Sequence, residues 1–454
     1  MGDCMNNKRL KSGLVGLAAL TALATTALQV PAAAQASTAP AVLTDLQVAA
    51  LSPGALAVRL APLRAAGYAL TDAGKSRAGS GIYTNVDIDS DRLLVNLYVT
   101  DTSRAAGLIR AAKKADPSID TGLIRIHKAA YTLEQLHAAR KSFVAQSHPF
   151  DVYAVGPAMD GSGLMVEVKD PAAVVKNTRV SKFAAGDATA PAIKIVFEHG
   201  TRRTDKVLHV NTVATGKTPA LAARPMSDSW SAVKWHDSAP FIGGDVITPD
   251  GHSYCTTGLP AVRISDNHPY MVTAAHCFGL NTQVYTAAGT TWAWGNGQTG
   301  NFVGNVAGRY TDWDAELLDG TNNNADESDN EGWKPLTSVK YSLKGDSVCQ
   351  SGARSAYFGH GTPCGIKVTN PDLWFPVDGY SSRGVEGVDV NGWGAVQGDS
   401  GATVFTYTDS SNNRQARGII SSGGTDGTAD QARVDWTEAI DIFNAYGLKL
   451  NPTT

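Results

Sequence analysis

Cysteine is scarce in this chain, with five residues in 454, and none of them forms the Cys-x-x-Cys spacing typical of zinc sites. Beyond the apolar N-terminal stretch, no segment is long and apolar enough to cross a membrane. Tryptophan is missing from the first 225 residues, and all nine tryptophans follow them. The first half has no basic–aromatic interleaving that would indicate a nucleic-acid surface, and none of its histidines has metal-ligand spacing. These absences argue against a zinc protein and a nucleic-acid binder.

The N-terminus has the pattern of a secretory signal. A basic stretch at 8–11 precedes an apolar run at 14–28, and Ala-Gln-Ala at 34–36 fits a small-residue cleavage site. We therefore predict a signal peptide at 1–36 and a secreted protein with no membrane association after its removal. A membrane anchor is the alternative.

The cysteines agree with export. Cys4 would leave with the signal, and an even set in an exported chain predicts two disulfides. Sequence alone permits three pairings, and proximity favours the first with the second and the third with the fourth. The four retained cysteines are Cys255, Cys277, Cys349 and Cys364.

Charge divides the chain near residue 225. The first 225 residues carry 26 Lys and Arg against 17 Asp and Glu, whereas the rest carry 13 against 25, a net of −12. Without the signal, the segment 37–225 has a net charge of +7. Opposite net charges favour encounter between the two parts, although two independent domains with unrelated surfaces would look the same. The basic cluster Arg110, Lys113 and Lys114 is expected to be a solvated helix face.

The two parts also differ in pattern. Residues 37–225 predict a mixed α/β structure, with strands at 92–99, 164–168 and 193–197 and a helix at 132–143 that Thr132 caps. Residues 226–454 predict an all-β domain, because short apolar runs alternate with Gly, Asn, Asp and Ser turns. A helix with an apolar stripe is expected at 436–446, and Gly447 would end it.

Two motifs in the second part indicate nucleophilic catalysis. Thr-Ala-Ala-His-Cys places a histidine at 276, and Gly-Asp-Ser-Gly places a serine at 400 on a glycine-flanked turn. A serine hydroxyl needs an imidazole to take its proton before it can attack at neutral pH. The order His, acid, Ser is one of the known orders of the catalytic triad, and two aspartates between the motifs, Asp312 and Asp314, are candidates for the acid.

These motifs resemble the chymotrypsin-like serine proteases, and the long preceding segment resembles the secreted bacterial streptogrisin and α-lytic type. The resemblance covers about residues 241–454 and implies two six-stranded antiparallel β-barrels with the active site between them. It implies His276 as general base and Ser400 as nucleophile. The family places apolar residues three and four positions after the acid, which selects Asp314, with Asp312 as runner-up.

The same resemblance implies further site residues. Gly398 and Ser400 would supply the backbone N–H groups of an oxyanion hole, and Asp399 would hold that turn. Ser421 would reach the triad aspartate, whereas Ser422 and Gly423 would pair with the substrate backbone as an added strand, which implies polypeptide substrates. No metal and no cofactor is expected.

Side-chain specificity is the least readable property. Trypsin-like members carry an aspartate six residues before the nucleophile, where this chain has Gly394, so medium or large apolar residues are expected before the cleaved bond. Asp389 would line the pocket only if the loop length differed. Ala402 and Thr403 depart from the family pattern and would alter the oxyanion turn.

The acidic stretch from Asp319 to Glu331 offers oxygen ligands but lacks EF-hand spacing. We expect a solvated loop, with calcium binding as the alternative.

The sequence thus predicts a secreted, monomeric serine endopeptidase made as a preproprotein. The segment 37–225 would assist folding and block the cleft until it is removed, and 226–454 would be the protease domain. The mature N-terminus would lie near 223–225 or at Phe241. A catalytically inactive binding protein and a serine esterase on the same scaffold are the alternatives.

Overall fold

The computed structural model describes residues 42–176, 193–210, 234–289, 292–329, 332–408 and 413–452. The predicted signal peptide and the candidate processing stretch at 223–225 lie outside these residues. No helix in the described ranges is long and apolar enough to cross a membrane.

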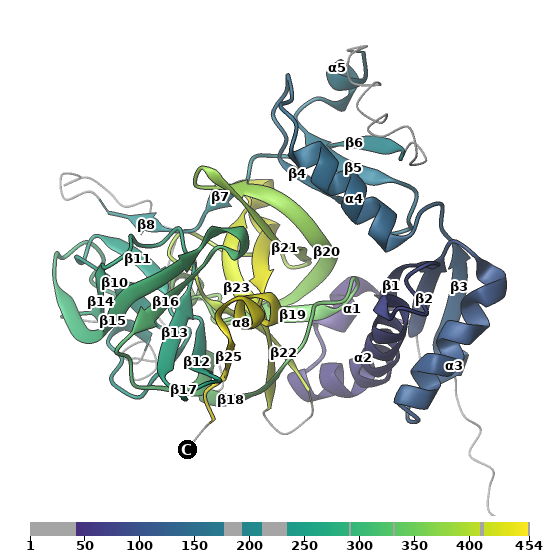
Figure 1. Ribbon diagram of the computed structural model, residues 1–454. Coiled ribbons are helices and arrows are strands. Elements are labelled where there is room, and N and C mark those ends of the chain that lie inside the picture. The colour runs from purple at the N-terminus through teal and green to yellow at the C-terminus, as the bar shows by residue number, and fades with distance from the viewer. Residues whose placement is uncertain are drawn as a thin grey trace, which may run out of the picture. The chain divides into compact units, whose positions relative to one another are not determined.

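The first half begins with a small sheet covered by helices (Figure 1). Strand β2 buries alternate residues, Val95, Leu97 and Val99, as the period of two requires. Helix α2 buries Leu60 and Leu63 against the same core. Strands β1 and β2 are antiparallel, and β2 and β3 are parallel through the crossover helix α3. The elements are α1 (Asp45–Ala49), α2 (Pro53–Lys75), β1 (Tyr83–Asp89), β2 (Leu94–Val99), α3 (Ala105–Ala115) and β3 (Ile124–Lys128).

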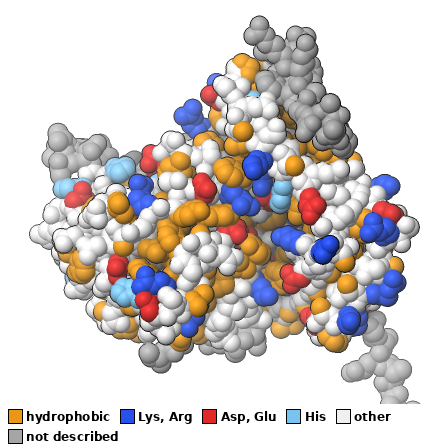
Figure 2. All heavy atoms as spheres, in the orientation of Figure 1, with side chains coloured by type: hydrophobic (Ala, Val, Ile, Leu, Met, Phe, Trp, Pro, Cys, Tyr) orange, Lys and Arg blue, Asp and Glu red, His pale blue; other side chains and the backbone are white. Residues whose placement is uncertain are grey.

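Helix α3 carries the basic cluster noted in the sequence. Arg110, Lys113 and Lys114 are exposed, whereas Leu108 and Ala112 face the core. Figure 2 shows Lys and Arg side chains gathered on this side of the molecule. The cluster is therefore a solvated helix face, as expected.

A second small sheet follows, and it joins the second half of the chain. Thr132 caps α4 and forms a capping box with Gln135, as the predicted cap required. Strands β4 and β5 are antiparallel, β5 and β6 are parallel, and Val155 of β4 pairs with Trp374 of the long strand β20. The elements are α4 (Leu133–Val144), β4 (Ala154–Pro157), β5 (Leu164–Val168), α5 (Pro171–Lys176), β6 (Ile195–His199) and β20 (Cys364–Val377).

The second half is all-β, as predicted, apart from short helices. Its first sheet has the strand order β25-β12-β13-β16-β15-β14-β10-β11-β8 and buries Met271, Val303 and Leu318. The recorded pairings leave this path open, which differs from the closed barrel implied by the family resemblance. The strands are β8 (Leu208–His209), β10 (Val246–Thr248), β11 (Ser253–Thr256), β12 (Leu259–Arg263), β13 (Pro269–Thr273), β14 (Gln283–Ala287), β15 (Thr299–Tyr310), β16 (Ala315–Asp319) and β25 (Leu448–Leu450).

The second sheet contains a closed ring of six antiparallel strands. The pairings run β20-β19-β22-β23-β24-β21 and return to β20, so every strand has two neighbours. The ring encloses Val348, Val404 and Ile420. The remaining strands are β19 (Ser347–Gln350), β21 (Tyr380–Asp389), β22 (Thr403–Tyr407), β23 (Arg414–Gly423) and β24 (Arg433–Glu438).

Two disulfides pair the cysteines as proximity favoured. Cys255 bonds Cys277 beside the first sheet, and Cys349 bonds Cys364 across β19 and β20. Each bridge closes a short loop, 22 and 15 residues apart in sequence. Such cross-links stabilise a fold by restricting the unfolded chain.

The C-terminal helix is shorter than predicted. Trp436 lies in β24, where it pairs with Val385 on one side and Ile420 on the other and is completely buried. Closing the ring of strands therefore overrides the helical spacing of this residue. Helix α8 (Ala439–Tyr446) begins three residues later, and Gly447 ends it in the left-handed conformation, as expected.

The acidic stretch 319–331 is not a solvated loop. Most of it forms the hairpin of β17 (Asn323–Asp329) and β18 (Gly332–Val339), and β17 also pairs with β9 (Phe241–Gly243). Glu327 and Asp329 are buried, and both face the guanidinium of Arg414. Burial raises the pKa of Glu327 well above its usual value.

Candidate active site

The two motifs and one aspartate meet in a buried chain of hydrogen bonds. Nε2 of His276 lies 2.6 Å from Oγ of Ser400, and its Nδ1 lies 2.7 Å from Oδ2 of Asp314. The backbone N–H of His276 donates to the other carboxylate oxygen at 3.0 Å. Of the two candidate aspartates, Asp314 is the one in contact, whereas Asp312 is exposed. This is the arrangement in which an imidazole can take a proton from a serine.

Turns at strand ends position these three side chains. His276 follows β13, Ser400 precedes β22, and Asp314 lies between a 3-10 turn and β16. Asp314 has φ +40° and ψ +49°, the left-handed conformation, which aspartate tolerates better than most residues. Its carbonyl accepts from the N–H of Ala275, which ties the aspartate turn to the histidine turn.

Two hydroxyl groups also hold Asp314. Ser421 donates to Oδ2, as the family resemblance implied, and Tyr380 donates to Oδ1. Sequence reasoning missed Tyr380, which stands 66 residues beyond the aspartate on β21 and belongs to no motif. Burial and the neighbouring Asp314 carboxylate raise the pKa of Tyr380, so it stays a donor.

Asp314 raises the pKa of the His276 imidazole. Burial alone lowers the pKa of His276, but the Asp314 carboxylate outweighs it, and the pKa lies above the usual 6.5. A negative charge beside Nδ1 stabilises the imidazolium that forms when the serine loses its proton.

The glycine-flanked turn points two N–H groups at one oxygen. The N–H groups of Gly398 and Ser400 both donate to the carbonyl of Lys206, the latter at 3.3 Å. Gly398 has φ +103°, and a Cβ there would lie 2.9 Å from Cβ of Arg354, so only glycine fits. The departures at Ala402 and Thr403 leave this pair of donors intact.

Asp399 holds the turn from inside. It is fully buried, and it accepts from the N–H groups of Ser355 at 2.9 Å and Val396 at 3.0 Å. Burial raises its pKa. It makes no contact with His276, so its role here is structural, as expected. Ser355 belongs to the short helix α7 (Ala353–Tyr357).

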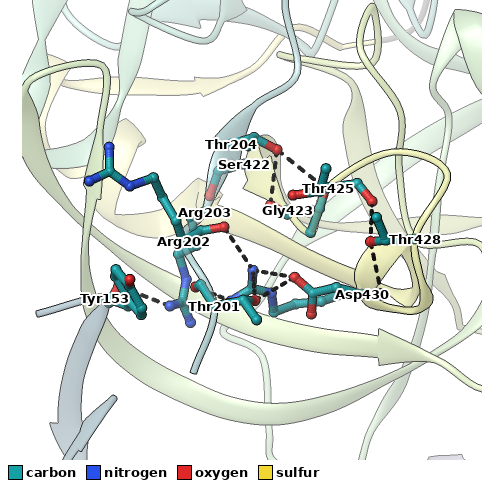
Figure 3. Close-up of polar contacts among 12 residues, drawn as sticks. Tyr153, Thr201, Arg202, Arg203, Thr204, Ser422, Gly423, Thr425, Thr428 and Asp430 are labelled. Carbon is teal, nitrogen blue, oxygen red and sulfur yellow. Dashed lines mark hydrogen bonds and ion pairs between the residues drawn. The ribbon is translucent and has the colours of Figure 1, made fainter. Parts of the chain in front are cut away.

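A segment of the first half runs through the site. Strand β7 (Thr204–Asp205) pairs antiparallel with β23, Asp205 opposite Ser422 and Thr204 opposite Gly423. On the far side of Ser400, β8 pairs with β11. Figure 3 shows Thr204 beside Ser422 and Gly423, Thr201 beside Asp430, and Arg203 reaching toward Tyr153. The residues expected to bind a substrate strand therefore hold this segment.

Lys206 fills the position next to the serine. Its N–H donates to Oγ of Ser400 at 2.9 Å, and its Nζ lies 2.7 Å from Oδ1 of Asp426. This differs from the expected apolar side chain. Gly394 offers no room for an acid, because a Cβ there would lie 2.6 Å from the carbonyl oxygen of Ala432.

Asp389, the alternative acid for the specificity pocket, is not among the residues that contact Lys206. Asp389, at the end of β21, accepts from the N–H of Asn391 at 2.6 Å, and burial raises its pKa to about 6. Sequence reasoning missed Asp426, because it lies in the loop after β23 and belongs to no motif. In the ranges that the structure describes, no group of three or more His, Cys, Asp or Glu side chains is placed to hold a metal.

No protein-family model and no curated protein matches the sequence. Several solved structures do. Nocardiopsis protease has 22% identity and Thermobifida fusca protease A has 21%; each match covers 46% of this chain and 98% of the other, with a TM-score of 0.36. A glutamic-acid-specific serine protease has 18% identity over 46% of this chain and 100% of its own, with a TM-score of 0.37. The solved structures that this chain resembles are bacterial chymotrypsin-like serine proteases, and the resemblance covers 46% of its length.

Proposed function

We propose that this protein is a serine endopeptidase that hydrolyses peptide bonds through an acyl-enzyme. One observation carries the proposal. The hydrogen-bonded chain Asp314–His276–Ser400 ends at Lys206, whose N–H donates to Oγ of Ser400 and whose carbonyl accepts from the N–H groups of Gly398 and Ser400. A nucleophile, a base and an oxyanion hole thus converge on one peptide group.

The chemistry follows from these positions. Oγ of Ser400 attacks the carbonyl carbon while Nε2 of His276 takes its proton. The negative charge that develops on the oxygen is stabilised by the two N–H groups, because they are already aimed at it. His276 then gives the proton to the leaving amine, and water hydrolyses the ester with the same residue as base. Asp314 keeps the imidazole oriented throughout.

The way the segment binds favours peptides over simple esters. Thr204 and Asp205 are held by main-chain pairing with β23, a mode that recognises an extended polypeptide. An esterase would have no use for that strand edge. A catalytically inactive binding protein would not need His276 within hydrogen-bond reach of Ser400.

We further propose that the protein is exported, with a signal peptide at 1–36 and a pro-segment at 37–225 that assists folding and blocks the cleft. The two disulfides support an oxidising destination. The strand β7 supports the blocking role, because a substrate and this segment would compete for the same edge of β23.

Replacement of the nucleophile tests the function. Secreted wild type should react with an organophosphonate at Ser400 and lose its pro-segment, whereas Ser400→Ala should do neither. Intact mass and N-terminal sequencing measure both. If wild type is neither labelled nor cut, the endopeptidase proposal is wrong and the binding-protein alternative gains support. If wild type and Ser400→Ala are cut alike, another protease matures the chain, and labelling alone decides activity.

A further inference from the structure

The side chain of Lys206 is completely buried, although lysine is among the residues most rarely found so. Its ammonium group meets three oxygen atoms: Oδ1 of Asp426 at 2.7 Å, Oγ1 of Thr204 at 3.4 Å and the carbonyl of Gly424. An ammonium has three donors, so each finds an acceptor. Burying this charge without an anion would be costly, and Asp426 supplies the anion.

Apart from Thr204, the groups around that ammonium belong to the protease half. Asp426 is fixed by the N–H of Gln397, which donates to Oδ2 at 2.9 Å and leaves Oδ1 free for the lysine. Gln397 immediately precedes Gly398 of the oxyanion turn. Gly423 forms the wall, and a Cβ there would lie 2.9 Å from Cε of Lys206. The carboxylate and the oxyanion donors are thus held in one fixed geometry.

The backbone of the segment is placed as a substrate would be. The carbonyl of Lys206 lies at the oxyanion turn, the residues before it pair with β23, and the residues after it continue past the serine. Val207 and Leu208 are buried there, and Leu208 pairs with Tyr254 of β11. The bond presented to Ser400 is therefore the one between Lys206 and Val207.

We propose that this enzyme cleaves after basic residues, lysine before arginine, with Asp426 as the specificity-determining residue, and that the Lys206–Val207 bond is a cleavage site in its own chain. The inference rests on the proposed endopeptidase function. Hydrolysis of that bond consumes one water, leaves a carboxylate on Lys206 and frees the amine of Val207. Lysine is preferred because the acceptors close around a compact ammonium.

Peptides that differ only in the residue before the cleaved bond test the specificity. For processed wild-type enzyme, kcat/KM should fall in the order Lys, Arg, then Leu or Phe, with Glu lowest. Asp426→Asn should lower kcat/KM for the lysine peptide by about 30-fold. This is the lower end of the loss expected when one partner of a buried charge pair is removed, because the side chain of Asp426 is 34% exposed. The leucine peptide should be unaffected.

Asp266→Asn is the matched control, since this exposed carboxylate pairs with Arg263 in a turn away from the site. It should leave every peptide unchanged. Leu or Phe peptides cleaved as fast as Lys by wild type would overturn the proposal. So would an equal loss on lysine and leucine peptides in Asp426→Asn.

Variants of the full chain test the cleavage site and do not depend on purifying an altered enzyme. Wild type and Lys206→Arg should yield a fragment that begins at residue 207, and Lys206→Leu should not, by N-terminal sequencing. An unchanged cut in Lys206→Leu would overturn the proposal. Labelling of Ser400 distinguishes failure of this inference from failure of the proposed function. An enzyme that is labelled but has no lysine preference contradicts only this inference. A protein that is neither labelled nor active contradicts the proposed function as well.

Discussion

Asp314 receives four hydrogen bonds, from the ring and backbone N–H groups of His276 and from the hydroxyl groups of Ser421 and Tyr380. A carboxylate has about four lone-pair positions, so this one has no freedom to turn away from the imidazole. The left-handed backbone at Asp314 is kept in place by the same contacts. The orientation of His276 thus depends on residues that never touch a substrate.

The pH dependence of the activity tests the role of Asp314. The base must be neutral to act, and the Asp314 carboxylate raises the pKa of His276. Because the folded pKa is raised, kcat/KM should fall as pH drops through a value above 6.5. Asp314→Asn should lower kcat by about 10⁴-fold and move this acid limb to lower pH. A limb at the same pH in both enzymes would contradict the assignment of Asp314.

Tyr380→Phe tests the positioning contact that the motifs do not reveal. The variant keeps the ring and removes one hydrogen bond to a charged acceptor, worth about 1.5 kcal/mol, or about 10-fold. Since Tyr380 does not contact the segment in the cleft, kcat should fall while KM stays unchanged. Tyr446→Phe is a matched control, because its hydroxyl bonds the carbonyl of Ala315 outside the triad. A rise in KM alone for Tyr380→Phe would place the tyrosine in substrate binding instead.

At the scale of elements, local signals were reliable where local interactions decide the structure. Thr132 caps α4 and Gly447 ends α8, because caps depend on a few neighbouring residues. Trp436 was misplaced, because its partners on β21 and β23 are remote in sequence and their pairing outweighs the helical pattern. The acidic stretch was misread for the same reason, since Arg414 is remote in sequence from the carboxylates it faces.

The residues of the candidate site also differ in whether local sequence marks them. His276 and Ser400 lie in short motifs whose chemistry can be read directly, and Asp314 was selected by the apolar residues that follow it. Asp426 and Tyr380 come from segments that the closed ring of strands brings back to the site, so no spacing in the sequence marks them. A pocket acid can lie on any loop around the substrate side chain, so the glycine at 394 does not by itself define the specificity.

On the scale of the whole molecule, the opposite charges of the two halves meet in specific pairs. Among the residues that the structure describes, several basic residues of the first half contact acids of the second, and two pairs run the other way. Burial alone would raise the pKa of Asp372, but Arg140 and His137 outweigh it and hold the pKa below its usual value, so the stability from these contacts is lost as pH falls through the lowered pKa. The forward pairs are Arg64–Asp346, His137–Asp372, Arg140–Asp372, Arg203–Glu386, Arg203–Asp435 and Lys206–Asp426, and the reverse ones are Lys344–Asp87 and Lys367–Asp45.

Salt should therefore weaken the association of the two halves. We expect the inhibition constant of the separate pro-segment, added to processed enzyme, to rise between 0.1 and 1 M salt, because long-range attraction is screened. Buried pairs such as Arg64–Asp346 resist screening, so the dependence comes from exposed ones. Lys367→Ala removes a partly exposed pair, with Asp45, and should reduce the salt dependence. An inhibition constant that does not change in 1 M salt would refute the electrostatic argument.

The contacts far from the cleft should separate two events, the cleavage after Lys206 and the later release of the segment. Cutting after Lys206 breaks one covalent bond, but the pairing of β4 with β20 and the ion pairs of Arg64 and Arg140 remain. We therefore expect the new chain end to stay at the oxyanion turn and the cut molecule to remain inhibited. Activity should then begin after a lag, which would end when free enzyme degrades the bound segment of other molecules. A cut within one chain should proceed at the same rate at any dilution, whereas the lag should lengthen as the protein is diluted.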